Sequence, residues 1–310
     1  MNNDKKYIPV MLMPFNEDQS IDYNALDRLV DFYLESGASG LFANCLSSEM
    51  YQLSIAEMLT SVRHIVERVD GRVPVVATGS FGETMEEQAE NVKKIYSTGV
   101  AAVILISGLL AKETDSEEVF KENVYQLLRL TDEIPVGFYE CPVPYKRILS
   151  PELLGELVST GRVTYHKDTC LDIKAVRQKI AATTQESAFG LYDAYMVHAT
   201  DSLAAGSAGL SCIQGNYFPE LVVWLCDHYA DSTKQTEIDK VQGFFTRHMD
   251  VMHDTYPASA KYTLQKRGIP IGLTCRNGSV LPSEQTEIAL AELLQDFENL
   301  ADEIGLTLIK

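Results

Sequence analysis

The 310-residue sequence lacks long hydrophobic runs and has few basic residues for its acidity. No apolar stretch approaches the ~20 residues that a membrane-spanning helix needs, so we expect no membrane partner. The N-terminus shows no signal-peptide pattern. Lysine and arginine number 26 against 44 aspartate and glutamate residues, a formal net charge of −18. This balance argues against a basic nucleic-acid surface, so we expect no nucleic-acid partner.

Paired cysteines are also missing. The six cysteines show neither a C-x-x-C pair nor zinc-ligand spacing, and the histidines show no H-E-x-x-H pattern. Reduced cysteines act as small apolar residues. We therefore expect a reducing, cytoplasmic setting, no metal site and no cofactor. The cysteines are Cys45, Cys141, Cys170, Cys212, Cys226 and Cys275.

Eight short apolar runs are present, and segments with helical periodicity separate them. The runs are rich in β-branched and aromatic residues, as strands buried on both faces should be. They cover residues 7–13, 40–44, 74–79, 101–107, 135–140, 163–167, 187–192 and 208–213. Eight β-then-α units in succession predict a (β/α)₈ TIM barrel. A doubly wound open sheet is the alternative, although no G-x-G-x-x-G follows the first run.

Local signals place the helices between these runs. Capping boxes open at Ser54 and Thr84, and Ser150-Pro151 is a typical helix start. After residue 216 the strand pattern stops and helical segments cover 217–229, 236–256 and 283–304. The sequence thus predicts a barrel core over residues 1–216 and C-terminal helices packed on it over 217–310.

The segment VTYHKDT (163–169) ends a predicted strand with a lysine, Lys167. Active-site residues of such barrels lie at the C-terminal strand ends. A partly desolvated lysine has a lowered pKa and can attack a carbonyl to form a Schiff base. Tyr139, on the preceding strand, can transfer the protons. Ser47 and Ser48, near a helix start, can hold a carboxylate. Together they suggest a site for a 2-oxo acid.

Each of these residues also has an ordinary structural interpretation. A lysine after a strand is commonly a solvated charge, Tyr139 a core aromatic, and the SSE segment (47–49) a helix cap. Glu140 and Asp168 look like loop charges. His166 alternates with Lys167 along the strand, so we expect it to face the helices.

Taken in chain order, several segments resemble the dihydrodipicolinate synthase/N-acetylneuraminate lyase family, the class I pyruvate aldolases and lyases on a (β/α)₈ barrel. The likeness covers about residues 7–300. The segments are MPF (13–15), NCLSSE (44–49), GRVPVVATGS (71–80), FYECP (138–142), HKDT (166–169), GLYD (190–193) and AGLSCIQGN (208–216).

The resemblance implies roles for particular residues. Lys167 takes the position of the Schiff-base former and Tyr139 that of the proton carrier. Ser47 takes the place of a hydroxyl that bonds this tyrosine, and Ser48 completes the carboxylate-binding pair. Gly190 and Ser211 fall at the strand ends that line the pyruvate site. The family's usual assembly implies a homotetramer or dimer.

The departures from the family pattern concern the second substrate. Leu109 and Leu110 stand where the synthases have a tyrosine that completes a proton relay between subunits. Pro144 replaces an arginine that binds the distal carboxylate, and Lys146 or Arg147 is a possible substitute. We therefore expect a divergent lyase, aldolase or dehydratase acting on pyruvate or a related 2-oxo acid. The alternatives are a catalytically altered 2-oxo acid binding or regulatory homologue, and a metal-dependent lyase.

Overall fold

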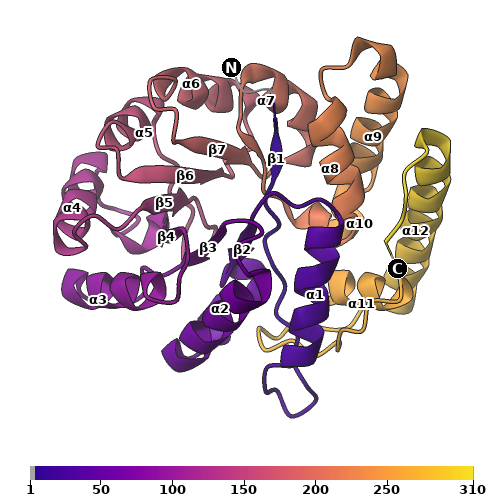
Figure 1. Cartoon of the computed structure of the whole chain (residues 1–310), viewed down its shortest axis with the longest axis horizontal. Helices are drawn as coiled ribbons and strands as arrows, with labels where there is room; N and C mark the ends of the chain where they lie inside the picture. Colours follow the sequence, from indigo (N-terminus) through magenta and orange to yellow (C-terminus); the bar gives the residue numbers. More distant parts are fainter. Residues whose placement is uncertain (1–3, 310) are drawn as a thin grey trace.

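Eight short parallel strands alternate with helices around a common axis in the computed structural model, which describes residues 4–309 (Figure 1). The strands are β1 (Lys6–Tyr7), β2 (Leu41–Ala43), β3 (Val75–Thr78), β4 (Ala102–Ile106), β5 (Val136–Tyr139), β6 (Val163–Asp168), β7 (Gly190–Asp193) and β8 (Gly209–Leu210). The barrel helices are α1 (Tyr23–Glu35), α2 (Ile55–Val69), α3 (Met85–Tyr96), α4 (Glu117–Leu130), α5 (Pro151–Val158), α6 (Ile173–Ala182), α7 (Ala199–Ala205) and α8 (Pro219–His228).

The sheet closes on itself. The strands pair in the order β1-β8-β7-β6-β5-β4-β3-β2, and Val10, just after β1, bridges to Phe42 of β2. The backbone N–H of Met11 donates to Phe42 O over 3.0 Å, and the N–H of Phe42 donates to Pro9 O over 2.9 Å. This closure confirms the predicted (β/α)₈ barrel and rules out the doubly wound sheet. β1 is shorter than predicted because Pro9 has no N–H to continue the ladder.

The predicted caps begin the helices. Ser54 Oγ accepts the N–H of Glu57 over 3.2 Å, and Glu57 Oε2 accepts the N–H of Ser54 over 2.9 Å. Thr84 makes the same reciprocal arrangement at α3, and Ser150 accepts the N–H of Leu153 ahead of α5. These side chains satisfy backbone donors that a helix start leaves free.

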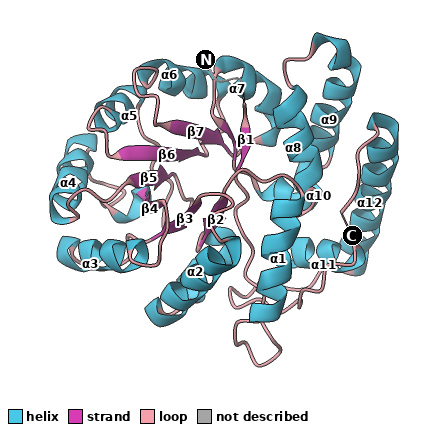
Figure 2. Cartoon of the chain, viewed as in Figure 1, coloured by secondary structure: helices cyan, strands magenta, loops and turns pink. Residues whose placement is uncertain are grey.

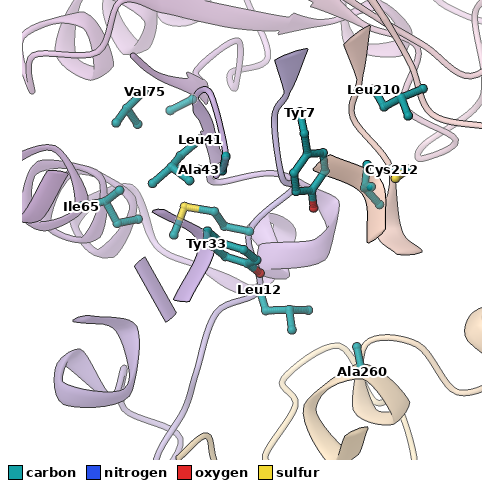
Figure 3. Close-up of a cluster of buried hydrophobic side chains, with 14 of the residues drawn as sticks. Tyr7, Leu12, Tyr33, Leu41, Ala43, Ile65, Val75, Leu210, Cys212 and Ala260 are labelled. Atoms are coloured by element: carbon teal, nitrogen blue, oxygen red, sulfur yellow. The ribbon is translucent and has the colours of Figure 1, made fainter. Parts of the chain in front are cut away.

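Strand alternation divides the core into two layers. Residues such as Phe42, Val76 and Ile104 point into the barrel, whereas Leu41 and Val75 face the surrounding helices. Figure 3 shows part of this outer layer, where side chains of the first strands meet those of α1 and α2. Since both faces are buried, the strands read as nearly continuous apolar runs.

Four further helices follow the barrel: α9 (Gln235–Arg247), α10 (Met249–His253), α11 (Ala258–Lys266) and α12 (Glu284–Ile304). Helices α9 and α12 lie at one side of the barrel (Figure 2). The continuous helix predicted over 236–256 is broken into α9 and α10, and α11 was not predicted. The break between α9 and α10 lies at His248, and Pro257, which disfavours helical backbone at the residue before it, separates α10 from α11. Within residues 4–309, no helix combines the length and apolarity needed to cross a bilayer.

The division of the chain at residue 216 stays a prediction. Helix α8 lies C-terminal to that division and contacts β1 and β8. It therefore occupies the place of the barrel's eighth helix.

Candidate active site

Lys167 and Tyr139 are direct partners across the β5–β6 ladder, close to the C-terminal ends of both strands. Both side chains point into the barrel. The Lys167 nitrogen lies 4.3 Å from the centroid of the Tyr139 ring and 6.0 Å from that of Phe42. Lys167 is only 3% exposed, so its amine is almost fully removed from bulk water.

Burial lowers the pKa of Lys167, and the nearby thiols of Cys45, Cys141 and Cys212 oppose this effect. Lys179 and Lys261, which are also buried, each contact a carboxylate within 3 Å. In the described part of the chain, Lys167 has no carboxylate within ion-pair distance. A buried amine without an anionic partner favours its neutral form, which is the nucleophilic one.

Tyr139 is positioned by aromatic packing. Its ring meets Phe42 edge to face at 5.7 Å between centroids. Burial, with a smaller contribution from Cys141, raises the pKa of the Tyr139 phenol well above its usual value. The phenol is therefore protonated at neutral pH and can act as a proton donor beside Lys167.

Ser47 and Ser48 lie on a 3₁₀ turn, η1 (Leu46–Ser48), directly after β2. Ser48 Oγ donates to Met11 O over 2.6 Å and accepts the N–H of Cys45 over 3.2 Å. It thereby joins the exits of β1 and β2. Both serines are buried. The hydroxyl of Ser48 is thus committed to the protein, while its role toward a substrate stays a prediction.

Ser211 and Gly190 lie at different levels of the barrel. Ser211, after β8, accepts the Tyr165 hydroxyl over 2.9 Å and donates to Ile8 O over 2.8 Å. Gly190 begins β7 and pairs with Tyr165, two residues before Lys167.

Gly190 also lines a cavity of about 570 Å³ together with Lys5 and Tyr229, near the N-terminal strand ends. The structure thus does not bring Gly190 to Lys167; Tyr192 is the β7 partner of that lysine.

A buried ionic cluster lies behind Lys167 and Tyr139, and the sequence did not predict it. Glu140 and Asp168, expected as loop charges, are both fully buried, so that expectation was wrong. Lys179 Nζ of α6 lies 2.5 Å from Glu140 Oε1 and 2.7 Å from Asp168 Oδ2. Glu140 and Asp168 directly follow Tyr139 and Lys167, so alternation along β5 and β6 turns them toward the helices. Lys179 is one of three basic residues in the segment IKAVRQKIAA (173–182), and nothing in that segment distinguishes it as the buried one.

His166 completes this cluster. As expected it faces the helices; its Nε2 lies 3.4 Å from Glu140 Oε1 and 3.7 Å from Asp168 Oδ2. Burial lowers the pKa of His166, but the neighbouring carboxylates of Glu140 and Asp168 outweigh it, so the net pKa is raised. Glu140, His166 and Asp168 are spaced closely enough to hold a metal ion. The ammonium of Lys179 supplies the positive charge between the two carboxylates instead.

The same cluster anchors both strand exits. Glu140 also accepts the N–H groups of Leu149 and Thr169, over 3.0 and 3.1 Å. Asp168 accepts the N–H of Cys170 over 2.8 Å. These contacts fix the loops on either side of the Lys167–Tyr139 pair.

Of the two candidate substitutes for the distal arginine, Arg147 is half-buried, and its guanidinium is bonded to other parts of the protein. It donates to Tyr145 Oη, to Lys112 O over 2.6 Å and to Asp115 O over 3.0 Å. Lys146 is exposed, and its Nζ donates to Thr169 O over 2.9 Å, two residues after Lys167. Lys146 is therefore the more exposed of the two, and its role toward a substrate stays a prediction.

The sequence matches known proteins over most of its length. The model of the dihydrodipicolinate synthetase family matches residues 3–297. A 4-hydroxy-tetrahydrodipicolinate synthase of Saccharophagus degradans is 27% identical over 263 residues, covering 84% of this chain and 87% of that protein. The enzyme of the same name from Laribacter hongkongensis is 27% identical over 270 residues, covering 85% and 89%.

Solved structures show the same fold. A monomeric dihydrodipicolinate synthase variant superposes with a TM-score of 0.85 at 21% identity, covering 96% of this chain and 97% of its own. YagE of E. coli K12, a prophage protein of the same family solved in complex with pyruvate, gives a TM-score of 0.84 at 21% identity, covering 95% and 98%.

Proposed function

The chain belongs to the dihydrodipicolinate synthetase family, and on that premise we propose that it is a class I lyase that forms a Schiff base between Lys167 and a 2-oxo acid. Family membership supports a pyruvate-dependent, aldolase-like activity. The observation that carries the proposal is the placement of Lys167. Its amine is buried, lies against the Tyr139 ring and, within residues 4–309, has no carboxylate at ion-pair distance.

The neutral amine of Lys167 adds to C2 of the 2-oxo acid. A C–N bond forms, the carbonyl electron pair moves to oxygen, and Tyr139 gives that oxygen its proton. The phenolate then takes a proton from nitrogen and returns it to the hydroxyl group, which leaves as water. The resulting iminium is an electron sink, and the phenolate removes a C3 proton to give the enamine. Every proton passes through one phenol, and no cofactor takes part.

The same enamine forms when a C3–C4 bond breaks, so the site serves aldol cleavage and addition alike. The carboxylate of the substrate would lie at the Ser47–Ser48 turn, with Ser211 below it. The altered positions at Leu110 and Pro144 concern the second substrate. We propose pyruvate or a related 2-oxo acid as the first.

Exchange of the pyruvate methyl protons in D₂O tests the proposal without a second substrate. Imine and enamine formation incorporate solvent deuterium at C3, which proton NMR detects as loss of the methyl signal. We expect the wild-type protein to catalyse this exchange. The Lys167→Met variant, which keeps the buried apolar stem, should leave only the background rate.

A second candidate is a 2-oxo acid binding or regulatory homologue, favoured by Leu110 and Pro144 at the altered positions. Saturable pyruvate binding without exchange would support that candidate over the lyase. A protein that neither binds pyruvate nor catalyses exchange would contradict both. We further propose a cytoplasmic location. We also propose a dimeric or tetrameric assembly, and sedimentation analysis can measure this assembly state.

A further inference from the structure

The cavity of about 570 Å³ lies at the end of the barrel opposite to the Schiff-base lysine. It is formed by the beginnings of β1, β6 and β7, by the residues just before β8 and by the ends of α6 and α7. Neither Lys167 nor Tyr139 lines it. The proposed lyase chemistry therefore leaves this cavity without a role.

Lys5, directly before β1, brings a half-buried ammonium to the cavity wall. Its Nζ donates to Ser207 O over 2.7 Å and lies 5.4 Å from the centroid of the Tyr229 ring. Within residues 4–309, no carboxylate lies at ion-pair distance from this nitrogen. A carbonyl and a ring face hold a cation less strongly than a carboxylate does. The ammonium has three N–H donors, so it can also bind an anion in the cavity.

Ser207 supplies a second group that needs a partner. The residue is fully buried and lines the cavity, and its Oγ has no hydrogen-bond partner among the residues that the structure describes. Its own carbonyl holds Lys5, so the unpaired hydroxyl and the ammonium are close neighbours. A buried polar group without a partner costs free energy. A ligand oxygen bound beside Lys5 would remove that cost.

Small residues and apolar side chains shape the rest of the cavity. Gly190 and Ala208 lie side by side: a Cβ added to Gly190 would lie 3.0 Å from the Ala208 Cβ and 2.8 Å from the Tyr192 ring. The Tyr192 ring therefore reaches back over Gly190 and forms part of the wall. Phe189 and Leu203 add apolar surface. These walls suit a ligand with an apolar body.

The charges around the cavity limit the charge of the ligand. Asp4 and Glu186 line it together with Lys5 and Lys6, so two carboxylates balance two ammonium groups. The C-terminal ends of α6 and α7 also lie here, and the dipole of a helix places negative charge at that end. A polyanion is therefore disfavoured, whereas a single carboxylate can be bound by Lys5.

We propose that this cavity binds a small carboxylic acid with an apolar body. Its carboxylate accepts hydrogen bonds from the Lys5 ammonium and the Ser207 hydroxyl, and its apolar part packs against Phe189 and Leu203. The site is separate from Lys167, and its existence does not depend on the proposed Schiff-base function.

Calorimetric titration with benzoate tests the inference, because benzoate has no ketone and forms no Schiff base. We expect saturable binding of one benzoate per chain. Benzamide, which keeps the shape but lacks the charge, should bind at least about tenfold more weakly, since a hydrogen bond to a charged group is weakened. Equimolar inorganic phosphate should not displace benzoate. Absence of saturable benzoate binding to the wild-type protein would overturn the inference.

Variants locate the bound benzoate. Lys5→Met should lower the affinity by about 10–100-fold, and Ser207→Ala, which removes one neutral hydrogen bond, by about 2–10-fold. Lys174→Met is the matched control, because Lys174 is an exposed lysine at the other end of α6; it should leave the affinity within about twofold of wild type. Lys167→Met should also bind benzoate normally. Full affinity in both Lys5→Met and Ser207→Ala, or loss of binding in Lys167→Met, would overturn the inference.

Discussion

The Lys167 nitrogen lies 4.3 Å from the centroid of the Tyr139 ring, and the two residues are paired across β5 and β6. The face of an aromatic ring attracts a cation weakly compared with a carboxylate. Among the residues that the structure describes, no carboxylate lies within ion-pair distance of Lys167 to hold its proton, and burial lowers its pKa. By contrast, Lys179 is buried one layer behind it between two carboxylates.

The phenol of Tyr139 is predicted to contribute by proton transfer rather than by packing. Tyr139→Phe keeps the edge-to-face contact with Phe42 and removes only the hydroxyl. We expect the exchange rate of pyruvate protons to fall by about 10²–10⁴-fold, the usual contribution of a positioned acid or base. Thermal unfolding should show a midpoint within a few degrees of the wild-type value. An exchange rate within threefold of wild type would contradict the assigned role.

Lys179→Met should strongly destabilise the fold. The change leaves Glu140 and Asp168 buried without their shared cation, and loss of one partner of a buried ion pair costs about 3–5 kcal/mol. Urea unfolding, with the free energy extrapolated to water, measures the effect. Adding Glu140→Gln should recover part of the loss, because one uncompensated charge is removed. Equal stability of Lys179→Met and the wild-type protein would contradict the described cluster.

His166 is predicted to make stability fall as pH rises. Its pKa is raised in the folded state, so above the unfolded value of about 6.5 the native protein binds more protons than the unfolded chain. The slope of unfolding free energy with pH is then negative. This contribution is complete below pH of about 6.5 and is lost as pH rises through the folded pKa.

Urea unfolding at several pH values compares the wild-type protein with His166→Gln. Between pH of about 6.5 and the folded pKa of His166, the unfolding free energy of the variant should fall less steeply with pH. Groups facing His166 are Glu140 after β5, Asp168 on β6 and Lys179 on α6. The pKa of His198, which lies beside Asp193, is also raised. Its own contribution to the fall of unfolding free energy with pH should remain in the variant. Identical pH slopes would show that His166 does not retain its proton.

Lys146 and Arg147 are predicted to differ in role. Lys146→Met should raise the KM for an anionic second substrate by about tenfold, which corresponds to one charged hydrogen bond of about 1.4 kcal/mol. Arg147→Gln should leave that KM unchanged and instead lower stability, because its guanidinium bonds Lys112 O and Asp115 O. Steady-state kinetics with neutral and anionic aldehydes measures the difference. The opposite pattern would place Arg147 at the substrate.

The barrel could be predicted because the periodicity of strands and helices, the helix caps and the strand ends are set by residues that are close together in the sequence. Ser54 and Thr84 marked their helices, and alternation placed Lys167 and His166 on opposite sides of β6. The ionic cluster was not predicted, because a buried charge can be recognised only when its partners are known. Lys179 and Glu140 are 39 residues apart in the sequence. The contact between Lys5 and Ser207 was not predicted for the same reason, since it spans 202 residues.

Borohydride reduction in the presence of pyruvate, followed by peptide mapping with mass spectrometry, tests the central claim most directly. Reduction converts a Schiff base into a stable secondary amine. We expect one pyruvate-derived adduct per chain, located on Lys167, and none in Lys167→Met. An adduct on another lysine, or its complete absence at saturating pyruvate, would contradict the account.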